Sequence, residues 1–128
     1  MRVLLDTHTL LWAVLSNASL SKKARAIILD QSTEVLVSAA SAWEIATKVR
    51  LGRLPMAEEF EANFLDDMQV AGYGLREVTV EDGLRAGRLV GDHQDPFDRM
   101  IAAQALNDDI AVISADDKLD GFGIRRIW

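Results

Sequence analysis

The sequence contains no cysteine. Disulfide bonds are therefore impossible, which suits a reducing cytosol without proving one. No window approaches the roughly 20 apolar residues of a membrane-spanning helix. The apolar start resembles a secretory signal, but Asp6 and His8 interrupt it and no clear cleavage site follows. We therefore expect a cytoplasmic protein that makes no membrane contact.

Basic residues are in the minority: 14 Lys and Arg stand against 20 Asp and Glu, a formal net charge of −6. This balance argues against a protein that coats nucleic acid through phosphate contacts alone, because such proteins are usually basic. It does not exclude a nuclease, since bound cations cancel part of the charge of carboxylate ligands. The net charge thus limits the mode of binding and leaves the class of ligand open.

Hydrophobic residues make up 49% of the 128 residues, enough for one core. We find no repeat, low-complexity tract or linker, so residues 1–128 are expected to form a single domain. Apolar runs consistent with buried strands occur in Arg2–Asp6, Glu34–Ser38 and Ile110–Ser114. Two weaker strands are placed at Leu75–Thr79 and Ile124–Trp128.

Segments with helical spacing separate these strands. Helices are predicted over Thr7–Leu15, a segment capped by Ser19 or Ser21, Ala39–Val49, Met56–Val70, Val80–Val90 and Pro96–Asn107. This alternation predicts an α/β protein, a three-layer α/β/α sandwich with a short central parallel sheet of four to five strands.

Four acidic residues fall at or near the expected carboxyl edge of that sheet. Asp6 ends the first strand and Asp116 follows the late strand. Glu44 lies one to two turns into the helix after the second strand, and Asp98 lies in the first turn after Pro96. Ligands of open parallel sheets bind beyond this edge, so we predict that the four acids form one site.

Each acid also has a simpler explanation. Asp6 and Asp116, taken singly, fit helix N-caps equally well. Asp98 fits the third helical position after an Asp95 cap, where an acid stabilises a helix terminus. Glu44 fits a pair with Lys48 on a solvated face. The simpler explanations require four independent coincidences, whereas one site explains all four positions. We therefore favour one site that contains the four acids.

The ligand type determines the chemistry of such a site. Clustered carboxylates without cysteine or an HExxH pair select hard cations, Mg²⁺ or Mn²⁺. Without metal the like charges repel, and at least one carboxylate is expected to be protonated. With metal, such a site orients and deprotonates a water and neutralises charge on a phosphodiester, so no histidine base is required. His8 and His93 are weak ligand candidates and are not included in the predicted site.

Four segments carrying these acids resemble the PIN-domain ribonucleases, most closely the VapC-type toxins of bacterial toxin–antitoxin pairs. They are Leu4–His8, Ser38–Ile45, Asp95–Ala105 and Ile113–Asp116, in the order and spacing of that family. The resemblance implies Mg²⁺-dependent endonucleolytic cleavage of RNA, with Asp6, Glu44, Asp98 and Asp116 as metal-binding acids. It also implies a homodimer and inhibition by a cognate antitoxin. His8 and Ser114 stand where Asn and Thr are common in the family.

Supporting roles are less defined by the sequence. Thr7 and Ser114 are candidates to hydrogen-bond the ligating carboxylates, with simple capping as the alternative. Arg99 fits a contact to a phosphate or to an antitoxin carboxylate, or an ordinary surface cation. Lys48, with Arg50 and Arg53, fits an RNA-backbone contact or a solvated face. Trp12 and Trp43 are interpreted as core or dimer contacts rather than base-stacking platforms.

Two other functions compete with the nuclease. One is a PIN-fold module that binds RNA or protein without catalysis, because a PIN fold can lose its activity. A receiver-type signalling domain has a similar length and an acidic Mg²⁺ pocket. The receiver type requires paired acids after the first strand and a Lys after the last one, and this sequence has a single Asp6 and no such Lys.

Overall fold

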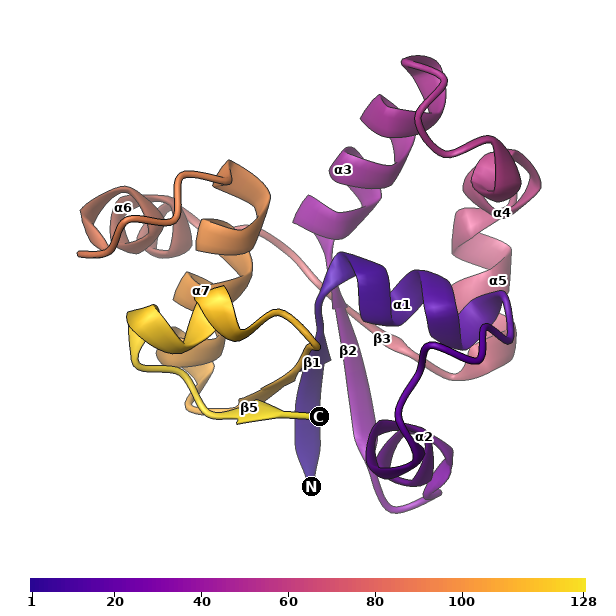
Figure 1. Cartoon of the computed structure of the whole chain (residues 1–128), viewed down its shortest axis with the longest axis horizontal. Coiled ribbons are helices and arrows are strands. Elements are labelled where there is room, and N and C mark those ends of the chain that lie inside the picture. Colours follow the sequence, from indigo (N-terminus) through magenta and orange to yellow (C-terminus); the bar gives the residue numbers. More distant parts are fainter.

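A five-stranded parallel sheet lies between two layers of helices in the computed structural model, which describes all residues, 1–128 (Figure 1). The predicted three-layer α/β/α sandwich is thus confirmed. None of its helices has both the length and the apolar character needed to cross a bilayer. The elements, in chain order, are β1 (Arg2–Leu5), α1 (Thr7–Val14), α2 (Lys22–Leu29), β2 (Glu34–Ser38), α3 (Ala39–Arg50), the 3₁₀ helix η1 (Pro55–Ala57), α4 (Glu58–Ala62), α5 (Phe64–Ala71), β3 (Gly74–Arg76), α6 (Val80–Arg88), α7 (Pro96–Asp108), β4 (Ala111–Ile113), the 3₁₀ helix η2 (Asp117–Phe122) and β5 (Arg126–Ile127).

The sheet has the strand order β3-β2-β1-β4-β5, and every pairing is parallel. The order reverses at β1, with β2 and β3 on one side and β4 and β5 on the other. Such a reversal opens a crevice beyond the carboxyl ends of the two strands that meet there, here β1 and β4. This order differs from the flavodoxin-like order 2-1-3-4-5, so the fold also argues against the receiver-type alternative.

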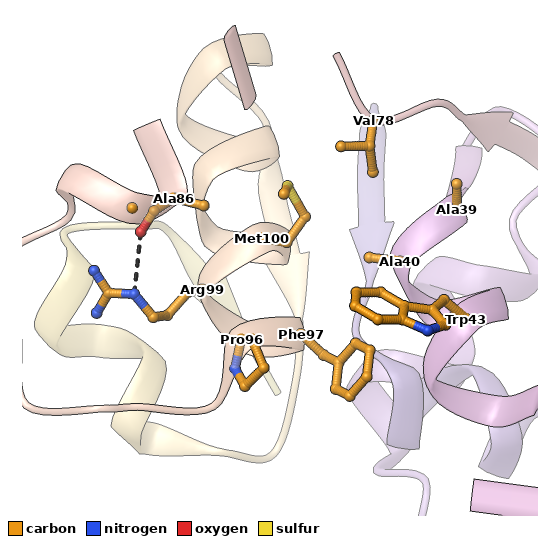
Figure 2. A pocket seen from close by; sticks show the side chains of 10 residues that line it. Ala39, Ala40, Trp43, Val78, Ala86, Pro96, Phe97, Arg99 and Met100 are labelled. Carbon is orange, nitrogen blue, oxygen red and sulfur yellow. Dashed lines mark hydrogen bonds between the residues drawn. The ribbon is translucent and has the colours of Figure 1, made fainter. Parts of the chain in front are cut away.

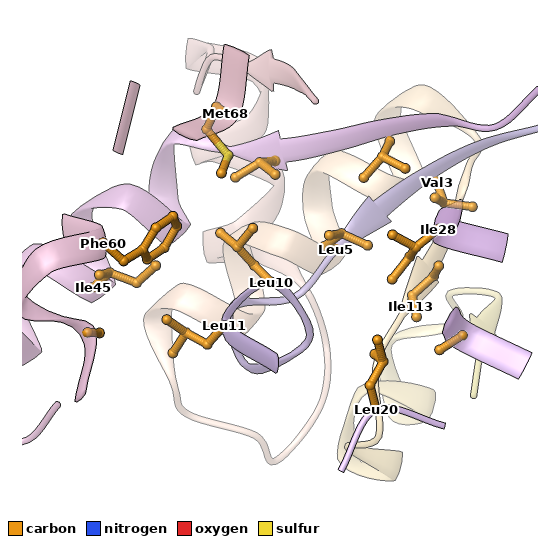
Figure 3. Packing of buried hydrophobic residues seen from close by; sticks show 14 residues of the cluster. Val3, Leu5, Leu10, Leu11, Leu20, Ile28, Ile45, Phe60, Met68 and Ile113 are labelled. Carbon is orange, nitrogen blue, oxygen red and sulfur yellow. The ribbon is translucent and has the colours of Figure 1, made fainter. Parts of the chain in front are cut away.

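Residues of β1 alternate between two hydrophobic clusters, one on each face of the sheet. Val3 and Leu5 belong to the larger cluster, which α1, α2, α3, α4 and α5 cover with side chains such as Leu10, Ile45 and Phe60 (Figure 3). Leu4 belongs to the smaller cluster, beneath α7 and η2. Because both faces of the strand are covered, its run of apolar residues is continuous.

For two predicted elements, the residue range was wrong. The single helix expected over Met56–Val70 is broken at Asn63 into α4 and α5. The Asn63 backbone has φ −110° and ψ 20°, and its side-chain amide donates to the Glu59 carbonyl oxygen. Such a local bond competes with helix continuation. The break still lets the Phe60 and Phe64 rings pack, with centroids 5.4 Å apart.

The strand expected over Leu75–Thr79 is shorter and begins earlier, at Gly74–Arg76. Thr79 cannot extend it, because Thr79 is the N-cap of α6. Its hydroxyl accepts from the Asp82 N–H, and its own N–H donates to the Asp82 carboxylate, a capping box. The helical 3₁₀ segment η2 was not predicted.

Candidate metal centre

Asp6 directly follows β1 and is 4% exposed. Its Oδ1 accepts the Thr9 N–H at 2.8 Å, so the carboxylate is the N-cap of α1. Its Oδ2 accepts a hydrogen bond from the hydroxyl of Ser114. The capping explanation for Asp6 is therefore correct, and it leaves the second carboxylate oxygen at the crevice between β1 and β4.

Ser114 and Asp116 follow β4 at the same edge. The Asp116 N–H donates to Ser114 Oγ at 3.0 Å, and the Asp116 carboxylate caps η2 by accepting the Lys118 N–H at 3.0 Å. Ser114 thus contacts both Asp6 and Asp116. The predicted bond from Ser114 to an acid of the site is present.

Glu44 lies on the second turn of α3 and is 3% exposed. The predicted pair with Lys48 is present, with Lys48 Nζ donating to Glu44 Oε2, but the solvated face expected for it was wrong. Glu44 Oε1 is buried and has no hydrogen-bond partner. An unpartnered buried acceptor costs about 1–3 kcal/mol. Glu44 therefore has one buried oxygen that is free to accept from or bind a further group.

Asp98 occupies the first turn of α7, after the Asp95 cap that accepts from the N–H groups of Phe97 and Asp98. Burial raises the pKa of Asp98. A hydrogen bond with His93 opposes this shift, and the negative charges of Asp95 and Glu44 add to it. The expected carboxylate repulsion is thus present, and a bound cation would relieve it.

Three side chains converge at this edge: His93, Asp98 and Asp116 offer ligand atoms that all lie within 4.8 Å of one another. His93 Nε2 lies 2.7 Å from Asp98 Oδ2. Asp6 and Glu44 lie outside this group of three. Asp6 joins it through Ser114, and the charge of Glu44 acts on Asp98.

His93 is the member that the sequence-based prediction set aside. The only local signal for His93 is that it lies two residues before the Asp95 cap. His93 and Asp98 therefore both lie near the start of α7. The hard oxygen donors of Asp98 and Asp116 fit a divalent cation, and the Glu44 charge that acts on Asp98 would favour one there.

The other candidates lie elsewhere. Thr7 shares a 3.0 Å hydrogen bond with Ser41 of α3 and so links the start of α1 to the helix that carries Glu44. Arg99 donates to the carbonyl oxygens of Ala86, Leu89 and His93, so it is neither an ordinary surface cation nor free for a phosphate. Lys48 is engaged by Glu44.

An apolar cavity of about 390 Å³ lies beside the acids, between α3 and α7 (Figure 2). Trp43 and Phe97 meet at its rim edge to face, with ring centroids 4.9 Å apart. Trp43 precedes Glu44 in sequence, and Phe97 precedes Asp98. Trp43 is 64% exposed, so the predicted core contact is wrong, and the alternative of a dimer contact stays a prediction.

Comparisons with known proteins agree with this fold. Residues 3–124 match the family model of the PIN domain. Ribonuclease VapC16 of Mycobacterium tuberculosis is 48% identical over 48 residues, which cover 38% of this chain and only 34% of that protein. The chain thus matches about a third of the length of this curated relative.

Solved structures are similar over nearly the whole chain. VapBC2 from Rickettsia felis, bound to a DNA fragment from its promoter, has a TM-score of 0.71 at 12% identity, over 99% of this chain and 98% of that one. VapC20 of Mycobacterium tuberculosis, a toxin that cleaves the sarcin–ricin loop, has a TM-score of 0.59 at 16% identity, over 95% of each chain. At such identities the likeness establishes the fold alone.

Proposed function

The chain belongs to the PIN domain family, and on that basis we propose that it is a divalent-metal-dependent endoribonuclease, the toxin of a toxin–antitoxin pair. The names of a relative, a ribonuclease, and of a structural neighbour, a toxin that cleaves the sarcin–ricin loop, support this assignment. The single observation that carries it is the convergence of Asp98 and Asp116 beside Glu44, whose buried oxygen has no partner.

The acids would hold Mg²⁺, or Mn²⁺, with Asp98 and Asp116 as direct ligands and Glu44 and Asp6 completing the site. When bound, the cation supplies an activated water and neutralises charge on the phosphodiester. Ser114 and the N–H of Thr9 fix the Asp6 carboxylate in place.

RNA would approach over the end of α3. Lys48 and Arg99 are occupied by contacts within the protein, so the exposed cations near this helix end are Arg50 and Arg53. These two side chains would hold the backbone as point charges, which adds affinity without reading sequence.

Asp98→Asn tests the metal-dependent cleavage, with Asp95→Asn as its matched control. Both residues are in the first turn region of α7, and Asn preserves the cap at position 95. Asp98→Asn should lose Mg²⁺-dependent cleavage and the rise in melting temperature that millimolar Mg²⁺ gives by linkage. Asp95→Asn should keep both.

RNA 5′ ends mapped after induction of each variant in cells give the cleavage positions. Equal cleavage by wild type and Asp98→Asn would overturn the catalytic role of the site. A wild type whose melting temperature responds to Mg²⁺ but which cuts no RNA would favour the binding module instead.

An antitoxin would cover the apolar cavity and the acids together. Trp43 and Phe97 border the cavity and adjoin Glu44 and Asp98, so one apolar segment seated there would block access to the site (Figure 2). Trp43→Asp should therefore weaken inhibition by the cognate antitoxin and leave cleavage by the free protein intact. Unchanged inhibition would exclude this cavity as the docking site.

We also propose a homodimer. Leu65 of α5 and Leu75 of β3 are exposed apolar side chains that line one groove with Ala42 and Ala46 of α3. Burial of this groove against a second copy would remove apolar surface from water at the open edge of the sheet. Leu65→Asp should give a monomer in light scattering if this face forms the dimer.

A further inference from the structure

The segment between α6 and α7 is held in place by two side chains, Arg99 and Phe122. Arg99 donates to the carbonyl oxygens of Ala86, Leu89 and His93, and its guanidinium lies over the Phe122 ring, 5.4 Å from the centroid. Gly91 has φ +154°, and a Cβ at this position would lie 2.9 Å from the Phe122 ring. The loop is therefore closely fitted to η2, which begins at the metal centre.

The fitted loop gives the His93 ring a defined orientation. The ring stacks on Phe122, with centroids 6.1 Å apart and an interplanar angle of 27°. Its Nε2 points to Asp98 Oδ2 at 2.7 Å, and the side chain is 17% exposed. An imidazole fixed by its backbone, its ring face and its Nε2 loses little freedom on binding a ligand.

The distance between His93 and Asp98 is close to that between neighbouring ligands of one cation. In an octahedral shell with bonds of about 2.1 Å, adjacent ligand atoms lie about 3 Å apart and opposite ones about 4.2 Å apart. The contact between His93 and Asp98 is close to the first value, and the atoms of His93, Asp98 and Asp116 all lie within 4.8 Å. The negative charge of Glu44 also acts on Asp98, and one buried Glu44 oxygen has no hydrogen-bond partner, as expected beside a place that takes a cation.

We propose that His93 supplies a nitrogen ligand to the cation held by Asp98 and Asp116. This ligand makes the preference of the centre for Mn²⁺ over Mg²⁺ stronger than the preference of the carboxylates alone. The inference rests on the metal centre of the proposed function. A neutral imidazole binds through Nε2 and keeps its proton on Nδ1. Imidazole suits first-row transition-metal ions, of which Mn²⁺ binds most weakly, whereas Mg²⁺ holds to oxygen ligands and water, so a nitrogen ligand favours Mn²⁺ over Mg²⁺.

The experiment compares His93→Gln with wild type, and His8→Gln is the matched control because the chain has no other histidine. The glutamine amide can still donate to Asp98, so a role in positioning alone would survive the change. Electron spin-echo measurements on the Mn²⁺-loaded proteins detect a bound imidazole nitrogen. Mn²⁺ affinity is read from the signal of the free ion, and Mg²⁺ affinity from competition with Mn²⁺.

Wild type and His8→Gln should show the nitrogen coupling, and His93→Gln should lack it. The Mn²⁺ affinity of His93→Gln should fall about 10–100-fold, the loss typical when a residue that supports a metal site is removed. Its Mg²⁺ affinity should fall by clearly less. His93→Asn, a second variant, covers the case in which the glutamine protein does not fold.

Two results would overturn the proposal: a wild type without nitrogen coupling, or a His93→Gln protein that prefers Mn²⁺ over Mg²⁺ as strongly as wild type does. RNA cleavage is assayed separately. A protein that shows the coupling but cuts no RNA would contradict the proposed function and leave the histidine ligand standing.

Discussion

Ser114 donates its hydroxyl hydrogen to the carboxylate of Asp6, across 108 positions of the chain. The same hydroxyl oxygen accepts the N–H of Asp116 at 3.0 Å. Ser114 is fully buried, so neither contact competes with water. One side chain therefore fixes the spacing between the acid that follows β1 and the acid that follows β4.

Ser114→Ala should destabilise the protein and weaken its metal centre. A hydrogen bond to a charged group contributes about 1.5–3 kcal/mol, and its loss leaves the buried carboxylate with fewer donors. Metal affinity should fall about 10–100-fold. Urea unfolding and metal titration measure the two effects. Ser114→Thr keeps the hydroxyl and should lose much less, so equal losses in both variants would refute the role assigned to the hydroxyl.

Asp82 is ionised within a buried network away from the metal centre. Burial alone would raise its pKa, but bonds from Thr79, Arg76 and Asn107 outweigh burial and hold the pKa of Asp82 at about 2. Arg76 makes two of these bonds, at 2.8 and 2.9 Å, and also contacts Asp108. The network ties β3 to α6 and α7.

The pH dependence of stability follows from this lowered pKa. The unfolded carboxylate binds protons at higher pH than the folded one, so the stabilisation is present above pH 5 and is lost as pH falls through 2. It amounts to about 2 kcal/mol at pH 7 and roughly half of that at pH 3. The difference in unfolding free energy between wild type and Asp82→Asn should therefore shrink from pH 7 to pH 3. Glu81→Gln, at the exposed neighbouring position, is the matched control because it leaves the network of Asp82 intact.

Much of the fold, and the positions of Asp6 and Asp98 within it, could be predicted because their signals are local. Val3 to Leu5 form a continuous apolar run, and Asp6 ends it, so the strand, the cap and the sheet edge are all readable from a few residues. Asp95 and Pro96 mark the start of α7 in the same way and thereby locate Asp98.

The features that could not be predicted depend on contacts between distant elements. His93 reaches Asp98 because Arg99 and Phe122 hold its loop, and neither contact has a signature in the sequence around His93. Glu44 and Lys48 are spaced as a surface pair, and only the packing of α3 against its neighbours buries Glu44. Trp43 shows the reverse case, an apolar residue that packing leaves exposed.

Arg99→Met should loosen the loop that carries His93. The variant keeps an unbranched chain but removes the donors to three carbonyl oxygens at the end of α6 and in the loop. Hydrogen exchange of the amides in residues 89–95 should accelerate, and the free energy of unfolding should fall by at least about 2 kcal/mol. Arg88→Met, at an exposed neighbouring position, is the control. Unchanged exchange in this loop would show that other contacts hold it.

Lys48 compensates a buried charge in the protein without metal. Glu44 is 3% exposed and Lys48 Nζ is its one side-chain partner, so Lys48→Met leaves an uncompensated carboxylate. Loss of one partner of a buried pair is strongly destabilising, and we expect about 2–4 kcal/mol here because Lys48 is partly exposed. Adding Glu44→Gln should recover much of that loss, since the charge itself is removed.

Metal should act on these variants in opposite ways. A cation bound beside Glu44 replaces the missing positive charge, so Mn²⁺ should raise the melting temperature of Lys48→Met by more than that of wild type. Mn²⁺ should raise the melting temperature of the double variant by less, because Glu44→Gln removes the carboxylate that would face the cation. Equal shifts in all three proteins would mean that Glu44 does not face the cation, and its unpartnered oxygen would then need a different explanation, such as a buried water.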